Sequence, residues 1–327
     1  MAVYDKIACM TNQQYRVVFM GSPQFSRPIL QVLVDNELFN VVGVVTQPDR
    51  PKGRGRKLVP PPIKELAQDL TIPVIQPKRL RKDESAKEQL CSWAPDVIVV
   101  AAFGQILKPD VLDFPEHGCI NVHTSLLPRW RGASPIQAAL LHGDEVTGVT
   151  IMKMDPGMDT GPILSQEAYK IPDGITYGEL ETVLSSLGAA LLMDTLPDYM
   201  NGKITLVTQD DSFATKAPLI NKKDGLLDFS QPGKSLVRKV CAFNPWPSAY
   251  TMFHGQNFKI LKAHFIKAQQ TEKGTFVIKE ELPAIGCVDG WLVLDEVQPA
   301  GKKRMDGAVF LRGNREKWLH AHDDIGI

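Results

Sequence analysis

Short apolar runs in the first hundred residues leave this chain few choices of fold. The runs Tyr15–Met20, Val41–Thr46 and Asp96–Ala102 are rich in β-branched side chains, as strands buried on both faces of a parallel sheet require. Helical patterns follow them, and this alternation predicts an α/β fold with a doubly wound, mostly parallel sheet. Asp96–Ala102 is the most apolar of the runs, so we place it at the centre of the sheet.

The turn after the first run reads Gly21-Ser22-Pro23. It lacks the spacing Gly-x-Gly-x-x-Gly, and the sequence therefore predicts no dinucleotide site here. We expect Ser22 to cap the helix that follows, with Pro23 at the first helical position.

Beyond residue 221 the pattern changes to short strands separated by glycine, asparagine and aspartate about every ten residues, which predicts a small β-barrel. Residues 202–218 are polar and have no strong period, as a linker does. The predicted division is an extension at residues 1–14, a first domain at 15–206, a linker at 207–221 and a second domain at 222–327.

Composition narrows the function. The chain of 327 residues is 43% apolar and 23% charged, as in ordinary globular proteins, and its formal net charge of zero argues against a protein that wraps long nucleic acid. The charge is uneven, because residues 221–327 carry sixteen Lys and Arg against twelve Asp and Glu. A basic second domain has the sign expected for contact with RNA.

The five cysteines are scattered and form no Cys-x-x-Cys pair, which argues against a disulfide framework and against a zinc site, so we expect no metal. No apolar stretch reaches the roughly 18 residues of a membrane helix. The first fifteen residues contain Asp5 and Lys6 and no apolar core, unlike a secretory signal. We expect a cytoplasmic monomer.

The chemistry concentrates between Cys119 and Gly161. Asn121 and His123 are two residues apart, so on a strand their side chains leave from the same face. Asp159 lies on a glycine-rich loop after the next predicted strand. An Asn that donates to an oxyanion, a His that moves a proton and an Asp that orients the imidazole together suit acyl transfer. The alternative is that these residues have only a structural role, because a buried His can bond a carboxylate without taking part in catalysis and Asp is a common turn former among glycines.

A second candidate is the loop from Gln47 to Pro62, which must face solvent because it carries five cations between glycines and prolines. It follows the carboxyl end of a strand, where α/β folds place ligand-binding loops. The alternative is a solvated charge run, which is also our interpretation of Lys78–Lys82. The five cations are Arg50, Lys52, Arg54, Arg56 and Lys57.

Two motifs carry a family resemblance. The run His-Thr-Ser-Leu-Leu-Pro-Arg-Trp-Arg-Gly-Ala-Ser-Pro-Ile from His123, followed by Asp-Pro-Gly-Met-Asp-Thr-Gly-Pro from Asp155, resembles the signatures of folate-dependent formyltransferases. The likeness covers nearly the whole chain from about Arg16. Residues 20–25, the basic loop at 46–57 and the motif Ala-Phe-Asn-Pro-Trp-Pro-Ser at 242–248 are similar to those of family members that act on methionyl-tRNA.

The resemblance implies a Rossmann-like first domain, an OB-like second domain that binds tRNA, and no metal. The implied reaction moves the formyl group of 10-formyltetrahydrofolate to the α-amino group of methionyl-tRNA, giving formylmethionyl-tRNA for translation initiation. Asn121, His123 and Asp159 would be catalytic. The folate would contact Phe103, Gly104, Ile106, Ser125, Leu126, Leu127 and Pro128, since we expect the turn Ser125–Pro128 to expose its two leucines. The five cations of the basic loop would contact the acceptor stem.

Other readings remain open. Glycinamide ribonucleotide formyltransferase should lack the second domain. An amino-sugar nucleotide formyltransferase would share Asn121, His123 and Asp159, but the basic loop and the Phe-Asn-Pro-Trp-Pro motif argue against it. A catalytically inactive RNA-binding relative would not need these three residues. Hydrolysis of the formyl donor to formate is supported by the same residues.

Overall fold

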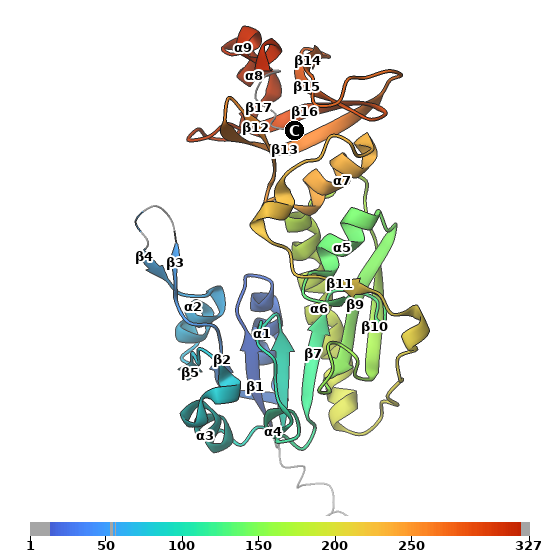
Figure 1. Ribbon diagram of the computed structural model, residues 1–327. Coiled ribbons are helices and arrows are strands. Elements are labelled where there is room, and N and C mark those ends of the chain that lie inside the picture. The colour runs from blue at the N-terminus through green and yellow to red at the C-terminus, as the bar shows by residue number, and fades with distance from the viewer. Residues whose placement is uncertain (1–13, 53–54, 56, 322–327) are drawn as a thin grey trace, which may run out of the picture. The chain divides into compact units, whose positions relative to one another are not determined.

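The computed structural model describes residues 14–52, 55 and 57–321 (Figure 1). Of the predicted extension at residues 1–14, all but Gln14 lies outside the described residues. The chain forms two compact units. The first takes in the chain up to residue 131 together with 148–168 and 182–215, and the second takes in 132–147, 169–181 and the chain from 216 onward.

The first unit is built on a seven-stranded sheet with the order β10-β9-β7-β6-β1-β2-β5. β7, β6, β1, β2 and β5 pair in parallel, while β9 is antiparallel to β7. β6 is the fourth of the seven strands, so the central position predicted for the most apolar run is confirmed. The strands are β1 (Tyr15–Gly21), β2 (Phe39–Val45), β5 (Val74–Ile75), β6 (Val97–Ala101), β7 (Cys119–His123), β9 (Val146–Lys153) and β10 (Ile163–Lys170).

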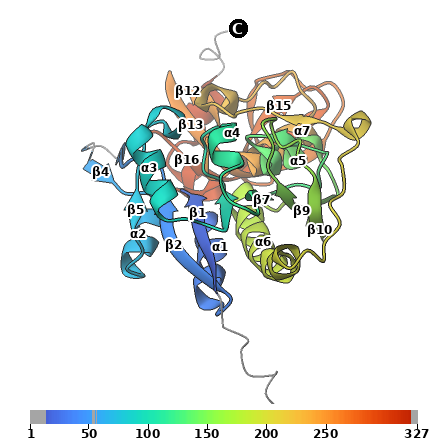
Figure 2. The same ribbon diagram turned by 90° about the horizontal axis from the view of Figure 1, so that it is seen from below.

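Helices cover both faces of this sheet, which confirms the doubly wound fold. Figure 2 shows α1 and α6 on one face and α3 and α4 on the other. Under α3 and α4, one core cluster joins Leu90 and Trp93 to Val18 and Met20 of β1 and Ile98 of β6. The helices are α1 (Ser26–Asp35), α2 (Pro62–Asp69), the 3-10 helix η1 (Leu80–Lys82), α3 (Glu84–Ser92), α4 (Pro109–Leu112), α6 (Tyr177–Met200) and the 3-10 helix η2 (Asp211–Phe213).

The expected cap of α1 is wrong. The helix begins at Ser26, and its N-cap residue Phe25 makes no side-chain hydrogen bond. The Ser22 hydroxyl instead accepts hydrogen bonds from the Thr46 hydroxyl at 3.2 Å and the Gln47 N–H at 3.1 Å. Ser22 therefore ties together the carboxyl ends of β1 and β2, and a turn separates it from the helix.

The basic loop contains regular structure. Two short antiparallel strands, β3 (Arg50–Lys52) and β4 (Lys57–Val59), form a hairpin in which Arg50 pairs with Val59. Asp49 fixes its base by accepting from Lys64 Nζ at 2.8 Å and from Gln76 Nε2 at 2.7 Å. The hairpin is therefore a projecting ribbon with a clamped base.

The second unit combines a helical part with an antiparallel sheet. α5 (Pro135–His142) packs against α7 (Gly233–Ala242), and α7 packs on β13. The sheet has the order β12-β13-β16-β15-β14, and β17 pairs with β16. Its strands are β12 (Ala249–Phe253), β13 (Gln256–Lys267), β14 (Phe276–Lys279), β15 (Leu282–Cys287), β16 (Gly290–Gln298) and β17 (Met305–Asp306). The remaining elements are β8 (Arg131–Gly132), β11 (Lys216–Ala217), the 3-10 helix η3 (Lys222–Gly225), α8 (Gly307–Arg312) and α9 (Arg315–Leu319).

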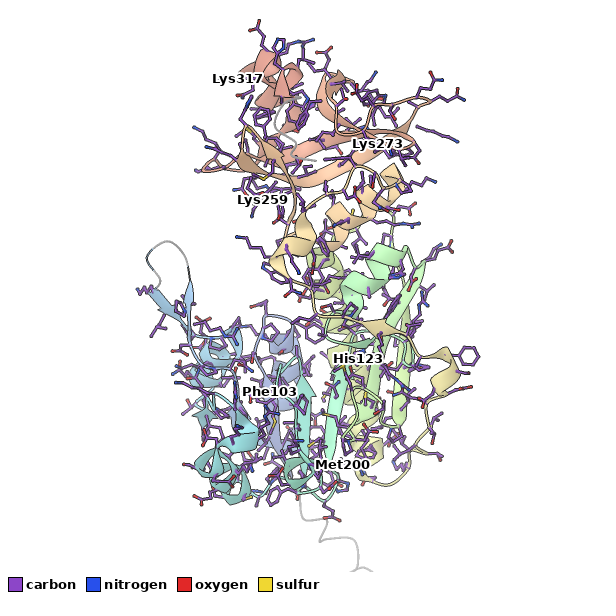
Figure 3. All side chains as sticks on the ribbon, in the orientation of Figure 1. Phe103, His123, Met200, Lys259, Lys273 and Lys317 are labelled. Atoms are coloured by element: carbon purple, nitrogen blue, oxygen red, sulfur yellow. The ribbon has the colours of Figure 1, made fainter. Side chains whose placement is uncertain are left out.

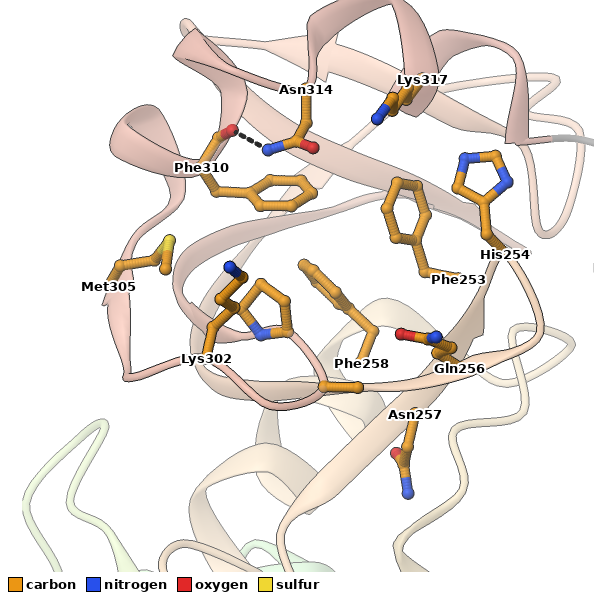
Figure 4. A pocket seen from close by; sticks show the side chains of 12 residues that line it. Phe253, His254, Gln256, Asn257, Phe258, Lys302, Met305, Phe310, Asn314 and Lys317 are labelled. Atoms are coloured by element: carbon orange, nitrogen blue, oxygen red, sulfur yellow. Dashed lines mark hydrogen bonds between the residues drawn. The ribbon is translucent and has the colours of Figure 1, made fainter.

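Aromatic side chains from the two outermost strands of this sheet meet in one core. Phe253 of β12 and Phe276 of β14, from the two outermost strands, approach to 6.2 Å between ring centroids, and Trp318 of α9 packs against both. A pocket of about 500 Å³ opens beside the cluster and is lined by Lys302 and Lys317 among others (Figure 4). The sequence did not predict β14, β17, α8 or α9.

None of the helices in the described part of the chain has the length and apolar character of a membrane span.

Candidate active site

The predicted polar pair lies on β7, inside the apolar sheet. Asn121 is 9% exposed and His123 is 6% exposed, and the neighbours of Asn121 in register are Val100 on β6 and Met152 on β9. Figure 3 marks His123 at the carboxyl end of the strand. Burial raises the pKa of the Cys119 thiol, at the start of β7, to about 12. That thiol is therefore protonated at neutral pH and does not act as a nucleophile.

The side chain of Asn121 is buried without a bonding role in the fold. Within the described part of the chain its amide makes no hydrogen bond to another protein group. The amide is not among the buried polar side-chain atoms that lack a hydrogen-bond partner in the described residues, so its polar end reaches the protein surface, where water can bond it. The amide is therefore available to a bound molecule at this position.

Both nitrogens of the His123 ring have protein neighbours. Nε2 lies 3.0 Å from the Trp130 carbonyl oxygen, and Nδ1 lies 3.7 Å from Asp159 Oδ1. A carbonyl can only accept, so Nε2 carries a hydrogen and donates it. Nδ1, the other ring nitrogen, faces the Asp159 carboxylate.

The loop that carries Asp159 is held in an unusual conformation. Asp159 itself has a φ of +53°, in the left-handed region that side chains other than glycine seldom adopt. Asp155 closes the loop by accepting from Gly157 N–H at 3.0 Å and from the Thr160 hydroxyl at 2.7 Å. At Gly161 an added Cβ would lie 1.9 Å from the Lys153 carbonyl oxygen, so only glycine fits. Asp155 forms the turn, and Asp159 faces His123 across 3.7 Å.

The turn Ser125–Pro128 follows β7 directly. The Ser125 hydroxyl donates to the Arg129 carbonyl at 2.6 Å, and Gln166 Nε2 donates to the Leu127 carbonyl at 2.9 Å. Leu127 is buried and Leu126 half-buried, so the expectation that the turn exposes two leucines is wrong. Leu127 packs instead with Met152 and Ile163.

The loop after β6 presents its backbone and one apolar side chain outward. Phe103 packs in the core, while Gly104 has a φ of +74° and Ile106 is 64% exposed. Gln47 Nε2 donates to the Phe103 carbonyl at 3.0 Å, and Gln47 Oε1 accepts from Arg50 of the hairpin at 3.2 Å. One side chain that the sequence did not single out thus connects the base of the basic hairpin with this loop.

The basic hairpin exposes Arg50 and Lys57. Lys52 lies on β3, and Arg54 and Arg56 lie outside the described residues. The hairpin, the turn after β7 and the loop after β6 follow the carboxyl ends of β2, β7 and β6. These strands run parallel in one sheet, so the three segments lie along the same edge of it. In the described part of the chain no group of three or more His, Cys, Asp and Glu side chains is placed to hold a metal ion.

Two family models match this chain. The family model described as formyl transferase matches residues 15–196, and that described as formyl transferase, C-terminal domain, matches residues 219–315. The methionyl-tRNA formyltransferase of Bacillus licheniformis is 47% identical over 301 residues, which are 91% of this chain and 95% of that protein. That of Bacillus subtilis is 46% identical over 315 residues, which are 95% and 98% of the two chains.

A solved structure shares the fold. The crystal structure of HypX from Aquifex aeolicus in complex with tetrahydrofolic acid superposes with a TM-score of 0.60 at 15% identity, covering 91% of this chain and 47% of that one. At this identity the likeness concerns the fold alone.

Proposed function

The chain belongs to the formyl transferase family, and from this we propose that it transfers the formyl group of 10-formyltetrahydrofolate to the α-amino group of methionyl-tRNA. It is a one-carbon transferase, and its product is the formylmethionyl-tRNA used to initiate translation. The observation that supports the chemistry is the Asn121 amide, which has no hydrogen-bond partner among the described residues. Asn121 lies on the same strand as His123, two positions before it, and His123 faces Asp159 of a neighbouring loop.

Asn121 is the oxyanion donor in this proposal. When the amine attacks a formyl carbon, negative charge develops on the formyl oxygen, and a prepositioned N–H stabilises that charge. The Asn121 amide suits this task because it needs to break no protein hydrogen bond first. A buried donor also acts in a medium of low polarity, where its interaction with the charge is stronger than in water.

His123 and Asp159 handle the proton. An α-amino group has a pKa near 8, so part of it is neutral at physiological pH and no strong base is needed beforehand. After attack the amine must lose a proton. Nδ1 of His123, the ring nitrogen that faces Asp159, would take it and pass it to the folate nitrogen as the bond between that nitrogen and the formyl carbon breaks. The Asp159 carboxylate at 3.7 Å then stabilises the imidazolium, while the Trp130 carbonyl holds the ring through Nε2.

The folate donor is proposed to bind along the same edge of the sheet. When bound it supplies the activated formyl group. The rigid turn Ser125–Pro128 and the outward backbone at Gly104 flank the carboxyl ends of adjacent strands, and exposed Ile106 offers an apolar contact for a planar ring. Asn121, on the strand that leads into this turn, offers its amide to a polar group of the ligand.

Binding of tRNA is assigned to the hairpin and the second domain. Exposed Arg50 and Lys57 neutralise phosphates, which fixes the position of the nucleic acid. In the second domain Lys302 lines the pocket beside the aromatic cluster and can contact a phosphate, whereas Arg304 already pairs with Glu296 at 2.5 Å.

Three further expectations are parts of this proposal. They are the predicted domain bounds of 15–206 and 222–327, a monomeric state and a cytoplasmic location.

The deciding experiment offers formyl-labelled 10-formyltetrahydrofolate to the enzyme in a single turnover, with methionyl-tRNA and an amino-sugar nucleotide present together. We expect the label on methionyl-tRNA. Asp159→Asn, which keeps the size of the side chain and removes its charge, serves as the matched control and should transfer far more slowly. Label on the sugar would identify a different acceptor, label only in formate would identify a hydrolase, and rapid turnover by Asp159→Asn would contradict the assigned roles.

A further inference from the structure

Part of the segment predicted to be a linker is built into the first unit beside the active site. Val207 pairs with Ile163 at the start of β10 through two backbone hydrogen bonds of 2.8 and 2.9 Å. Gln209 follows and is only 7% exposed. A polar side chain this deeply buried has to be satisfied by specific partners.

Gln209 uses its amide on the Asp159 loop. Nε2 donates both of its hydrogens to backbone carbonyls of that loop, to Asp159 at 2.9 Å and to Gly161 at 2.7 Å. Oε1 accepts from Nε of Arg131 at 3.0 Å. One amide therefore fixes the loop on both sides of Thr160 and is itself fixed by a guanidinium.

Arg131 extends the connection to the other side of the imidazole. Its NH2 group pairs with Asp211 at 2.8 Å, and its backbone N–H donates to the Thr215 carbonyl at 2.9 Å. The residue before it, Trp130, supplies the carbonyl that receives Nε2 of His123. The partners of both ring nitrogens thus lie on segments that Gln209 and Arg131 join.

We propose that Gln209, held by Arg131, is a positioning residue that sets the distance between the Asp159 carboxylate and Nδ1 of His123 and thereby the rate of proton transfer. The proposal rests on the proposed function for its kinetic consequence but not for its geometry. Asp159 needs such a brace because its left-handed backbone conformation is intrinsically unfavourable and persists only where the surroundings enforce it.

The test compares Gln209→Ala and Gln209→Glu with the unmodified enzyme. Glu has the same shape and accepts from Arg131, but its carboxylate cannot donate to the two loop carbonyls. We expect kcat to fall roughly 100-fold in both variants, as for a displacement of about 1 Å in an active site, while KM for folate and for methionyl-tRNA changes less than about threefold. Activity of Gln209→Glu should recover partly at low pH, where a protonated carboxyl donates again.

A crystal structure of each variant provides a readout that needs no substrate. The His123 Nδ1 to Asp159 Oδ1 separation should exceed the 3.7 Å of the intact protein. An unchanged separation, an unchanged kcat, or a loss of activity that lies wholly in KM would overturn the proposal. If Gln209→Ala does not fold, Arg131→Met removes the guanidinium that bonds Gln209 and Asp211 and keeps a side chain of similar length, and it answers the same question. Failure of the unmodified enzyme to formylate methionyl-tRNA would instead count against the proposed function.

Discussion

A buried amide that bonds to no described protein group, such as that of Asn121, adds little to folding and is free to act in chemistry. We expect Asn121→Ala to lower kcat about 10²- to 10³-fold, the usual effect of losing one oxyanion donor. The free energy of unfolding should change by less than about 1 kcal/mol, since no intramolecular hydrogen bond is lost. Single-turnover rates and urea denaturation measure the two quantities.

The isosteric variant Asn121→Asp makes the assignment sharper, because it preserves volume and replaces the donor with an acceptor. It should be at least as slow as Asn121→Ala. A fast Asn121→Asp enzyme would show that the amide N–H is not what the reaction needs.

At the residue scale, the sequence indicates reactive groups better than the groups that hold them. Asn121, His123 and Asp159 stand out by residue type and by their order along strand, turn and loop. Gln209 gave no signal, because a single Gln in an aperiodic polar segment looks like any surface residue. Its importance lies in hydrogen bonds with Asp159 and Arg131, which are 50 and 78 positions away, and such bonds exist only after folding.

At the element scale, buried parallel strands were predictable within about two residues, since a strand covered on both faces is continuously apolar. The hairpin β3–β4 was not, because its charged residues resemble a solvated loop and its pairing depends on the clamp at Asp49. Helices α8 and α9 have six and five residues, which is too short for a helical period to appear.

The hairpin should act by neutralising phosphates. We expect Arg50→Gln with Lys57→Gln to raise KM for methionyl-tRNA and to leave KM for folate unchanged. The slope of log KM against log salt concentration should fall by roughly 1 for each phosphate that the protein no longer neutralises. Steady-state kinetics over a range of salt concentrations measure both effects.

Lys78→Gln provides the matched control, since Lys78 is also an exposed cation but lies outside the hairpin. It should behave as the unmodified enzyme does. An equal effect of all three substitutions would mean that the protein responds only to net charge.

At the scale of the whole molecule, stability should depend on pH through Glu181. Burial raises the pKa of this carboxyl, although the hydrogen bond donated by the Tyr177 hydroxyl acts in the opposite direction. A raised pKa in the folded state means that stability is fully present below the pKa of the unfolded chain and is lost as pH rises through the folded value. We therefore expect Glu181→Gln to gain stability relative to the unmodified protein as pH rises above the ordinary pKa of a glutamate, about 4.3, in urea denaturation.

Glu179→Gln is the control of opposite sign. Hydrogen bonds from the Thr176 N–H and hydroxyl lower the pKa of Glu179, so its contribution is present at neutral pH and lost as pH falls. The two variants, two positions apart on α6, should diverge from the unmodified protein in opposite directions. Parallel curves would contradict the assigned causes.

A geneticist who mapped loss of function along this chain would find Gly161 beside the reactive residues, although it has no side chain to react with. Any substitution there meets a carbonyl oxygen at 1.9 Å and must displace the loop. A screen scored by cell growth alone would class Gly161 with Asn121 and His123. If the variants with a displaced loop still fold, a parallel screen for protein abundance would not separate Gly161 from the reacting residues. The set of positions that such a map marks as essential for activity will therefore be larger than the set of residues that take part in the reaction.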